Sequence, residues 1–252
     1  MRLKNKVAVV TGGGAGIGRA IAERFGREGA SVVVAEIDAA NGADAERCIR
    51  DAGGDAFFVQ TDVSNEMQVK AMAQKALDRY GRVDVLCNNA AILLIDEETR
   101  AHELTNETWD RTMAVNLRGY WLCSKYVIPA MLRQGAGSII HMASPTGILG
   151  FTRLTAYSTS KGGVVALMRA MAADYGPDNI RVNAIVPGTT DTPMNAVGLS
   201  DPKTRQHYIE VAPARRLAMP EDLAGIAVFL ASEDSSYCVG GIFTVDGGLT
   251  AV

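Results

Sequence analysis

The sequence predicts a single α/β domain with a doubly wound, parallel sheet of seven strands and helices on both faces. Short apolar runs occur at seven places, separated by longer segments with helical spacing, and this alternation is typical of parallel sheets. The chain has 252 residues, of which 48% are hydrophobic, enough for one large core without a second domain. The predicted strands cover residues 7–10, 32–35, 56–59, 83–87, 138–142, 181–186 and 242–245.

The first predicted strand runs directly into a glycine-rich turn and then into a helix over residues 19–29. The turn contains Gly12, Gly13, Gly14, Gly16 and Gly18. Glycines let a backbone approach a pyrophosphate closely, and the free N–H groups at a helix start favour an anion. Glycines alone also serve tight turns. The order of strand, turn and helix is what indicates a dinucleotide site and a sheet of the Rossmann type.

The second predicted strand ends at an acidic residue, Glu36, 20 residues beyond Gly16. A carboxylate at this place accepts hydrogen bonds from the adenosine ribose and repels a 2′-phosphate. Ala15 and Ile37 stand where an arginine or lysine would bind such a phosphate. We therefore predict NAD rather than NADP as the cofactor. The alternative interpretation is that Glu36 and Asp38 mark only the polar end of a strand.

A tyrosine and a lysine, Tyr157 and Lys161, lie four residues apart in a segment with helical character. Residues at i and i+4 share one face of a helix. The pKa of a free tyrosine is about 10, and a nearby ammonium group lowers it by favouring the phenolate. The pair is therefore a candidate general acid/base. By itself, such a pair also occurs by chance on solvated helix faces.

The sequence resembles the classical short-chain dehydrogenase/reductase family over nearly its whole length. The motifs that carry this resemblance are Thr11-Gly-x-x-x-Gly16-Ile17-Gly18, Asp62-Val63, Asn88-Asn89-Ala90, Asn116, Ser144, Tyr157-x-x-x-Lys161, and Pro187-Gly188 followed by Thr192. Ser144 precedes Tyr157 by 13 residues, the separation typical of the family. The order of the motifs makes a chance match implausible.

The resemblance implies roles for four catalytic residues. Tyr157 would exchange a proton with the substrate oxygen while a hydride moves between the substrate carbon and the nicotinamide, and Ser144 would hold that oxygen. Lys161 would lower the pKa of Tyr157 and bind the nicotinamide ribose. Asn116 would hold a water on the proton path to solvent. Taken alone, Ser144 could be an ordinary hydroxyl at the end of a strand, and Asn116 could be an ordinary amide inside a helix.

The resemblance also implies the cofactor contacts, with Asp62 and Val63 at the adenine. The expected set is Gly12, Gly14, Gly16, Ile17, Gly18, Glu36, Asp62, Val63, Asn89, Ala90, Tyr157, Lys161, Pro187, Thr190 and Thr192. Two positions depart from the family pattern. Ala91 stands where glycine is usual, which puts the local cofactor fit in doubt. Thr190 stands where an aliphatic residue is common, so we expect it to contribute through its backbone.

Within the domain we expect residues 1–140 to bind mainly the cofactor and residues 141–216 to carry the catalytic and substrate-covering segments. The covering segments are rich in apolar residues, which favours a cyclic or otherwise hydrophobic secondary alcohol and its ketone. Arg153 could anchor a substrate carboxylate, although a solvated arginine or a subunit salt bridge is the commoner role. The charged segment 93–104 could form a rim at the active site or a surface turn.

Charge and residue spacing argue against several other classes of protein. The net charge is −3 and basic residues are scattered, so nothing indicates a nucleic-acid partner. The apolar run near the start is too short for a signal peptide or membrane span, and we expect a cytoplasmic protein. The four cysteines and three histidines lack metal-ligand spacing, so we predict reduced thiols and no metal site. The resemblance implies a homotetramer.

The favoured function is an NAD-dependent oxidoreductase acting on a small molecule with a hydroxyl/ketone pair. One alternative is reduction of a carrier-bound 3-oxoacyl group, which would predict a basic patch near the pocket and NADPH; Glu36 disfavours it. A second is a catalytically silent regulatory protein that keeps a dinucleotide fold, since fold does not imply activity. The set of Ser144, Tyr157 and Lys161 disfavours that alternative.

Overall fold

The computed structural model describes residues 1–251 and confirms the predicted sheet. The strands are β1 (Val7–Thr11), β2 (Ser31–Glu36), β3 (Asp55–Gln60), β4 (Val85–Asn88), β5 (Gly137–Met142), β6 (Ile180–Pro187) and β7 (Ile242–Val245). Their spatial order is β3-β2-β1-β4-β5-β6-β7, and every neighbouring pair is parallel. The order changes direction between β1 and β4, which is the topological switch point where α/β sheets bind ligands.

The fourth strand begins two residues later than predicted. The backbone N–H of Val83 donates to the side-chain oxygen of Gln134 at 3.0 Å, so it does not join the sheet ladder. The carboxylate of Asp84 accepts from the backbone N–H of Val7, at the start of β1. The backbone of Asp84 still contacts both neighbouring strands, because its N–H donates to the carbonyl of Val7 at 2.8 Å and its carbonyl accepts from the N–H of Ser138 at 2.9 Å.

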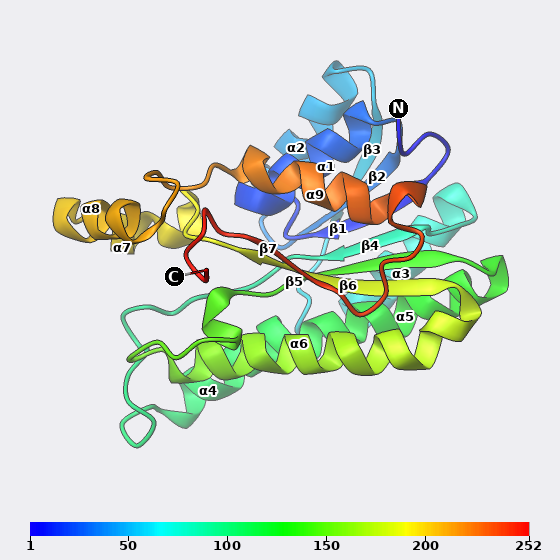
Figure 1. The fold of residues 1–252 in the computed structure, drawn as a ribbon. Coiled ribbons are helices and arrows are strands. Elements are labelled where there is room, and N and C mark those ends of the chain that lie inside the picture. Colours follow the sequence, from blue (N-terminus) through cyan, green and yellow to red (C-terminus); the bar gives the residue numbers. More distant parts are fainter. Residues whose placement is uncertain (252) are drawn as a thin grey trace.

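Helices cover both faces of the sheet (Figure 1). One face is covered by α1 (Gly16–Arg27), α2 (Ala39–Asp51) and α9 (Pro220–Ala231), and the other by α3 (Glu66–Tyr80), α5 (Gly119–Gln134) and α6 (Thr155–Tyr175). The helix α4 (Asn106–Met113) leads into α5 through a π-helical turn, η1 (Ala114–Arg118). The short helices are η2 (Pro145–Gly147), η3 (Gly176–Asp178), η4 (Pro193–Asn195), α7 (Ala196–Leu199), α8 (Pro202–Val211) and η5 (Glu233–Ser235).

The central strands are apolar on both faces because both faces are covered. Successive side chains of a strand point to opposite sides. In β1, Val7 and Val9 join the core beneath α3, α5 and α6, whereas Ala8 and Val10 join the core beneath α1, α2 and α9. The continuous apolar run at residues 7–10 is therefore the sequence signature of a strand packed between two helix layers.

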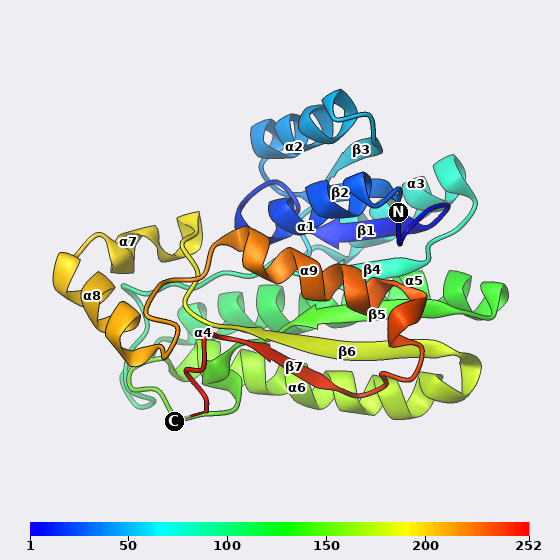
Figure 2. The same ribbon diagram turned by 45° about the horizontal axis from the view of Figure 1, so that its top comes forward.

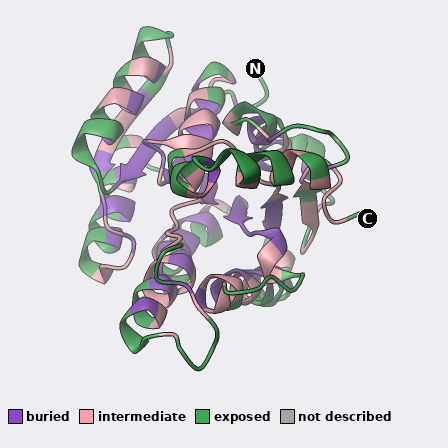
Figure 3. Cartoon of the chain, turned by 90° about the vertical axis from the view of Figure 1, so that its left-hand side faces the viewer, coloured by how far each residue is buried: buried purple, intermediate pink, exposed green. Residues whose placement is uncertain are grey.

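The two ends of the sheet differ in what surrounds them. Beyond the carboxyl ends of the strands lie the loops that follow β1, β4, β5 and β6, and α7 and α8 project past this end (Figure 2). Figure 3 looks onto this end, where buried strand ends are surrounded by loops and helices of mixed exposure. A candidate site at the carboxyl end is thus framed by the segments that vary most freely in a fold of this kind.

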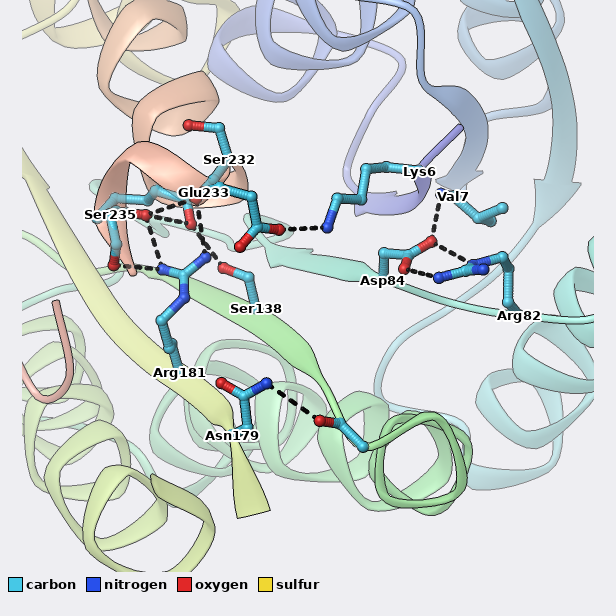
Figure 4. Close-up of polar contacts among 12 residues, drawn as sticks. Lys6, Val7, Arg82, Asp84, Ser138, Asn179, Arg181, Ser232, Glu233 and Ser235 are labelled. Carbon is cyan, nitrogen blue, oxygen red and sulfur yellow. Dashed lines mark hydrogen bonds and ion pairs between the residues drawn. The ribbon is translucent and has the colours of Figure 1, made fainter. Parts of the chain in front are cut away.

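The amino-terminal end of the sheet is closed by ion pairs and hydrogen bonds (Figure 4). Asp84 receives the guanidinium of Arg82 at 2.6 and 2.9 Å in addition to the N–H of Val7. Lys6 pairs with Glu233 at 2.6 Å and so ties the entry to β1 to the segment after α9. These contacts fix the strand starts from the side opposite to the candidate site.

Candidate active site

Ser144 lies just past the end of β5, where the chain turns into η2. Its Oγ accepts from the N–H and the hydroxyl of Thr146 at 3.3 and 3.0 Å, so Ser144 serves as the N-cap of η2. Gly147 allows η2 to pack against α6, because a Cβ there would lie 2.6 Å from the backbone of Lys161. This close approach brings Ser144 to the face of α6 that carries Tyr157.

One cavity of about 340 Å³, which we call the catalytic or first cavity, is lined by Ser144, Tyr157 and Lys161. The helix α6 supplies Tyr157 and Lys161 from adjacent turns of one face, as their spacing predicts. The rest of the wall is mostly apolar and includes Leu93, Ile95, Phe151, Leu154, Met194, Leu199, Tyr208 and Leu249. The three polar groups thus converge in a cavity of low polarity.

Burial shifts the pKa values of both members of the Tyr157–Lys161 pair. Lys161 is 1% exposed, and burial lowers its pKa to about 7. Burial raises the pKa of Tyr157 to about 12, and the Ser144 hydroxyl offsets part of that increase. Desolvation therefore dominates the pKa of Tyr157 in this arrangement, and the lowering by Lys161 that the resemblance implies does not appear.

The ammonium group of Lys161 is held by two groups from neighbouring elements. Its Nζ donates to the carbonyl oxygen of Met142 at 2.8 Å and lies 3.4 Å from the hydroxyl of Tyr120 on α5. The Tyr120 hydroxyl itself donates to the same carbonyl at 3.2 Å. Sequence reasoning missed Tyr120, because its contact depends on how α5 and α6 pack and leaves no local signal.

Asn116 is fully buried in the π-helical turn η1, behind the cavity wall. Its amide exchanges two hydrogen bonds with the backbone of Ile92, at 2.8 and 2.9 Å, and donates to the Ser160 hydroxyl at 3.2 Å. The side chain is thus occupied in joining the loop after β4 to α6. Its role in holding a water on the proton path stays a prediction.

A second cavity, of about 300 Å³, adjoins the first at the switch point of the sheet. Both cavities are bounded by Ile17, Asn89, Ala91, Thr192 and Met194, so they form neighbouring parts of one cleft. The expected cofactor residues in the wall of the second are Gly12, Gly16, Ile17, Glu36, Asp62, Val63, Asn89, Ala90 and Thr192. Tyr157, Lys161, Pro187 and Thr190 line the first cavity instead.

Two glycines of the expected cofactor set, Gly14 and Gly18, do not line the second cavity but allow the turn to form. A Cβ on Gly18 would lie 2.0 Å from the carbonyl oxygen of Gly12, and one on Gly14 would lie 2.7 Å from the Glu36 side chain. Gly12 has a φ of 62°, which favours glycine. The turn therefore presents bare backbone to the cavity at the start of α1, a geometry that fits a dinucleotide pyrophosphate.

Glu36 closes the second cavity from the end of β2. Its carboxylate is buried and accepts from the backbone N–H groups of Gly14 at 3.0 Å, Ile37 at 2.8 Å and Asp38 at 3.1 Å. Asp62 is the second acidic residue of the wall, and no lysine or arginine of the described chain joins them there. The charged side chains that the described residues contribute to this wall are therefore both acidic.

The departures at Ala91 and Thr190 are accommodated. Ala91 lines both cavities, and it is not among the residues with a positive φ, so its methyl group meets no backbone strain. Thr190 is buried, and its hydroxyl donates to the carbonyl of Gly188 at 2.9 Å. Its own carbonyl accepts from the side chain of Asn195 at 2.8 Å, which links the turn after β6 to η4.

The structure also distinguishes the two interpretations of segment 93–104. Leu93 and Ile95 line the catalytic cavity, so the segment forms part of its rim.

Arg153 is exposed with a φ of 58° and is not part of the cavity wall, unlike its neighbours Phe151 and Leu154. The geometry gives Arg153 no contact with the catalytic cavity.

Three further observations concern metal ions, thiols and membranes. Within residues 1–251, no cluster of three or more histidine, cysteine or acidic side chains is arranged to hold a metal ion. All four cysteines are free thiols, and burial raises the pKa of Cys87 and of Cys123 to about 12. No helix in the same range is both long enough and apolar enough to cross a bilayer.

Known proteins resemble this chain over almost its full length. A family model described as enoyl-(acyl carrier protein) reductase matches residues 12–250. The cis-4-hydroxycyclohexanecarboxylate dehydrogenase of Sinomonas cyclohexanicum is 41% identical, across 98% of this chain and 97% of that protein. The structure of levodione reductase has a TM-score of 0.94 at 33% identity, covering all of both chains. A protein of Beutenbergia cavernae assigned as an NAD(P)-dependent gluconate 5-dehydrogenase, with NADP bound at low occupancy, also has a TM-score of 0.94, at 37% identity over 99% of this chain and 98% of its own.

The fold, the cleft and these matches define the class of protein as an oxidoreductase that uses a nicotinamide dinucleotide. Within that class, the chain belongs to the classical short-chain dehydrogenase/reductase family, as its motifs indicate.

Proposed function

We propose that the protein is an NAD-dependent oxidoreductase that interconverts a neutral, cyclic or otherwise hydrophobic secondary alcohol and its ketone. The observation that carries this proposal is the convergence of Ser144, Tyr157 and Lys161 in an apolar cavity adjoining the glycine turn. We infer that residues 1–140 supply most cofactor contacts and residues 141–216 most catalytic and substrate-covering ones.

The polar residues of the cavity divide the proton chemistry among them. The bound nicotinamide would accept or donate the hydride. Tyr157 would exchange the proton with the substrate oxygen, and Ser144 would hold that oxygen by a hydrogen bond. With its pKa raised to about 12, the Tyr157 hydroxyl keeps its proton at neutral pH, which suits ketone reduction. Alcohol oxidation needs the deprotonated form, so we expect it to become faster between pH 7 and pH 9.

The preference for NAD rests on charge. A 2′-phosphate on the adenosine ribose would approach Glu36 and Asp62, with no lysine or arginine of the described residues in that wall to compensate. Two like charges about 4 Å apart near a protein surface repel by up to about 4 kcal/mol. We expect NAD to be favoured over NADP by about 100-fold in kcat/KM, which corresponds to about 2.7 kcal/mol. The NADP bound to the Beutenbergia protein makes this the comparison to test first.

The preference for a neutral substrate rests on the composition of the catalytic cavity. Lys161 is the one lysine, arginine or acidic side chain that the described residues contribute to its wall. A substrate carboxylate would lose water there without a dedicated cation to pair with it. We therefore expect neutral cyclic alcohols to be turned over at least tenfold more efficiently than carboxylated ones, although the Sinomonas relative is named for a carboxylate.

A homotetramer is also part of the proposal. An apolar groove runs between α4, α5 and α6 and is lined by Met113, Leu117, Trp121 and Leu167. Trp121 is 45% exposed in the single chain. An exposed tryptophan grouped in this way with partly exposed apolar residues favours association of subunits. Light scattering at micromolar concentration tests it, and a clean monomer mass would contradict it.

One assay tests the enzymatic proposal. NADH or NADPH formation is followed with NAD⁺ or NADP⁺ across cyclic, acyclic and carboxylated secondary alcohols, with the wild type beside Tyr157→Phe. Tyr237→Phe is the matched control, because Tyr237 is fully exposed. We expect turnover with NAD⁺ that Tyr157→Phe abolishes and Tyr237→Phe preserves. Binding of NAD⁺ without turnover of any alcohol would instead support a regulatory protein, and equal efficiency with both cofactors would refute the role of Glu36.

A further inference from the structure

The carboxylate of Glu98 is buried against the first turn of α6. Glu98 is 4% exposed, and it belongs to the rim segment 93–104, more than fifty residues before the helix that it contacts. Its Oε1 accepts from the backbone N–H of Tyr157 at 2.7 Å, and its Oε2 accepts from that of Ala156 at 3.1 Å. One carboxylate thus receives two consecutive N–H groups, one of them from Tyr157 itself.

The sequence at the start of α6 explains why this contact matters. The first backbone N–H groups of a helix have no partner within the helix, and a side chain at the N-cap usually satisfies one of them. Here the N-cap is Leu154, which has no polar side chain, and no side-chain cap is formed. Glu98 satisfies these N–H groups from outside the helix and places a negative charge at the positive end of the helix dipole.

The same segment is anchored on both sides of Glu98. The adjacent Glu97 accepts from the Thr108 hydroxyl at 2.8 Å and pairs with Arg111, which fixes the segment to α4. On the other side, the hydroxyl of Thr155 donates to the carbonyl of Thr99 at 3.0 Å, a second tie to the start of α6. The segment is therefore held between the two helices and cannot shift without moving the first turn of α6.

We propose that Glu98 is a positioning residue: its carboxylate fixes the first turn of α6 and so holds the Tyr157 side chain in register with Ser144. The inference rests on the proposed function, because it assigns Glu98 a part in placing the proton-transfer group. Leu93 and Ile95 lie in the same segment and line the cavity. The segment thus connects the wall of the catalytic cavity to α6, the helix that carries Tyr157.

The test compares Glu98→Gln and Glu98→Ala with Glu97→Gln, which changes the neighbouring carboxylate on the α4 side. The first measurement is amide hydrogen exchange by mass spectrometry on a peptide that spans residues 150–161. We expect exchange of this peptide to be at least tenfold faster in Glu98→Ala and to be unchanged in Glu97→Gln. Glu98→Gln keeps one acceptor oxygen and should fall between them, since an amide accepts at one of its two positions.

The second measurement separates positioning from folding. The kcat, the KM for the alcohol, the Kd for NADH by fluorescence and the melting temperature are determined for each variant. We expect kcat to fall by about 10- to 100-fold in Glu98→Ala, because displacing a catalytic group by about 1 Å has effects of this size. The Kd for NADH should stay within twofold of the wild-type value. Glu98→Gln should recover part of kcat, and Glu97→Gln should stay within threefold of the wild type.

Different results would contradict different parts of the proposal. Unchanged exchange in the Glu98 variants would overturn the anchor. Faster exchange with kcat within threefold of the wild type would overturn the positioning role, as would equal losses of kcat in the Glu97 and Glu98 variants. A wild-type protein that turns over no alcohol would overturn the proposed function instead, and the exchange measurement alone would then decide whether Glu98 holds the helix.

Discussion

Lys161 and Arg181 are both buried cations, but they lie at opposite ends of the sheet and are held in different ways. Burial lowers the pKa of each side chain, that of Lys161 to about 7. Arg181, at the amino end of β6, donates to the carbonyl oxygens of Ser232 and Ser235 at 3.1 and 3.0 Å and to the Ser235 hydroxyl at 2.7 Å (Figure 4). It thereby ties β6 to the segment that follows α9.

Lys161 has fewer close hydrogen-bond partners than Arg181. Its ammonium group carries three N–H donors, and within the described chain it has one close acceptor, the Met142 carbonyl, and the more distant hydroxyl of Tyr120. Unlike Arg181, it faces a cavity. Buried charges therefore serve two purposes in this fold. A charge whose hydrogen-bond partners are in place stabilises the structure, whereas one with unused donors beside a cavity is available to a ligand.

Replacing Lys161 should produce the largest effect and should separate activity from stability. We expect Lys161→Met to reduce kcat by about 10²- to 10⁴-fold, the usual contribution of acid–base groups. We also expect it to raise stability at pH 7 by about 1–4 kcal/mol, because it removes a buried charge that is poorly compensated. The Met142 carbonyl keeps the Tyr120 hydroxyl as its donor. Thermal unfolding and steady-state kinetics measure both effects.

The pH dependence of that gain has a defined sign. The pKa of Lys161 is about 7 in the folded protein and about 10.4 in an unfolded chain, so between these values the unfolded state binds the extra proton. Wild-type stability therefore rises with pH across this window relative to Lys161→Met. The advantage of the variant should be largest at pH 7 and below and should shrink toward pH 10. A constant gap, or an equal gain in the exposed control Lys125→Met, would contradict the assignment.

Replacing Arg181 should have the opposite effect on stability. We expect Arg181→Met to destabilise the fold by about 2–4 kcal/mol, because it removes three buried hydrogen bonds that join β6 to the segment after α9. The activity of each folded molecule should not change, since Arg181 lies at the far end of the sheet. Urea unfolding measures the loss, with the half-exposed Arg79→Met as a control expected to cost less than about 1 kcal/mol. If the fully folded Arg181→Met variant had a lower kcat than the wild type, the amino end of the sheet would be shown to influence the active site at the carboxyl end.

The parts of the molecule that the sequence predicts are those determined by neighbouring residues. The seven strands follow from short apolar runs, and their placement in a parallel sheet follows from the helices between them. Gly12, Glu36 and Tyr157 are recognised because spacing from a strand or helix start fixes where each lies. The start of β4 is the exception, since Gln134, about fifty residues away, takes the N–H of Val83.

What the sequence does not predict depends on packing between distant segments. Glu98 meets α6 only because the rim segment folds back between two helices, and nothing in its local sequence marks it as a cap. The pKa of Tyr157 shows the same limit: the spacing to Lys161 predicts a decrease, whereas the depth of the cavity produces an increase. Burial is a property of the whole fold, so local spacing gives the residues of the site but not their electrostatics.

Replacing Tyr120 should have the smallest effect and tests how tightly Lys161 is held. We expect Tyr120→Phe to reduce kcat by about three- to tenfold and stability by about 0.5–1.5 kcal/mol, the usual contribution of one hydrogen bond. Lys161 would keep the Met142 carbonyl but lose the hydroxyl beside it. Tyr126→Phe on the same helix is the control, because its hydroxyl bonds to Glu66 away from the cavity. If the two variants lose activity equally, Tyr120 contributes to the packing of α5 and not to the placement of Lys161.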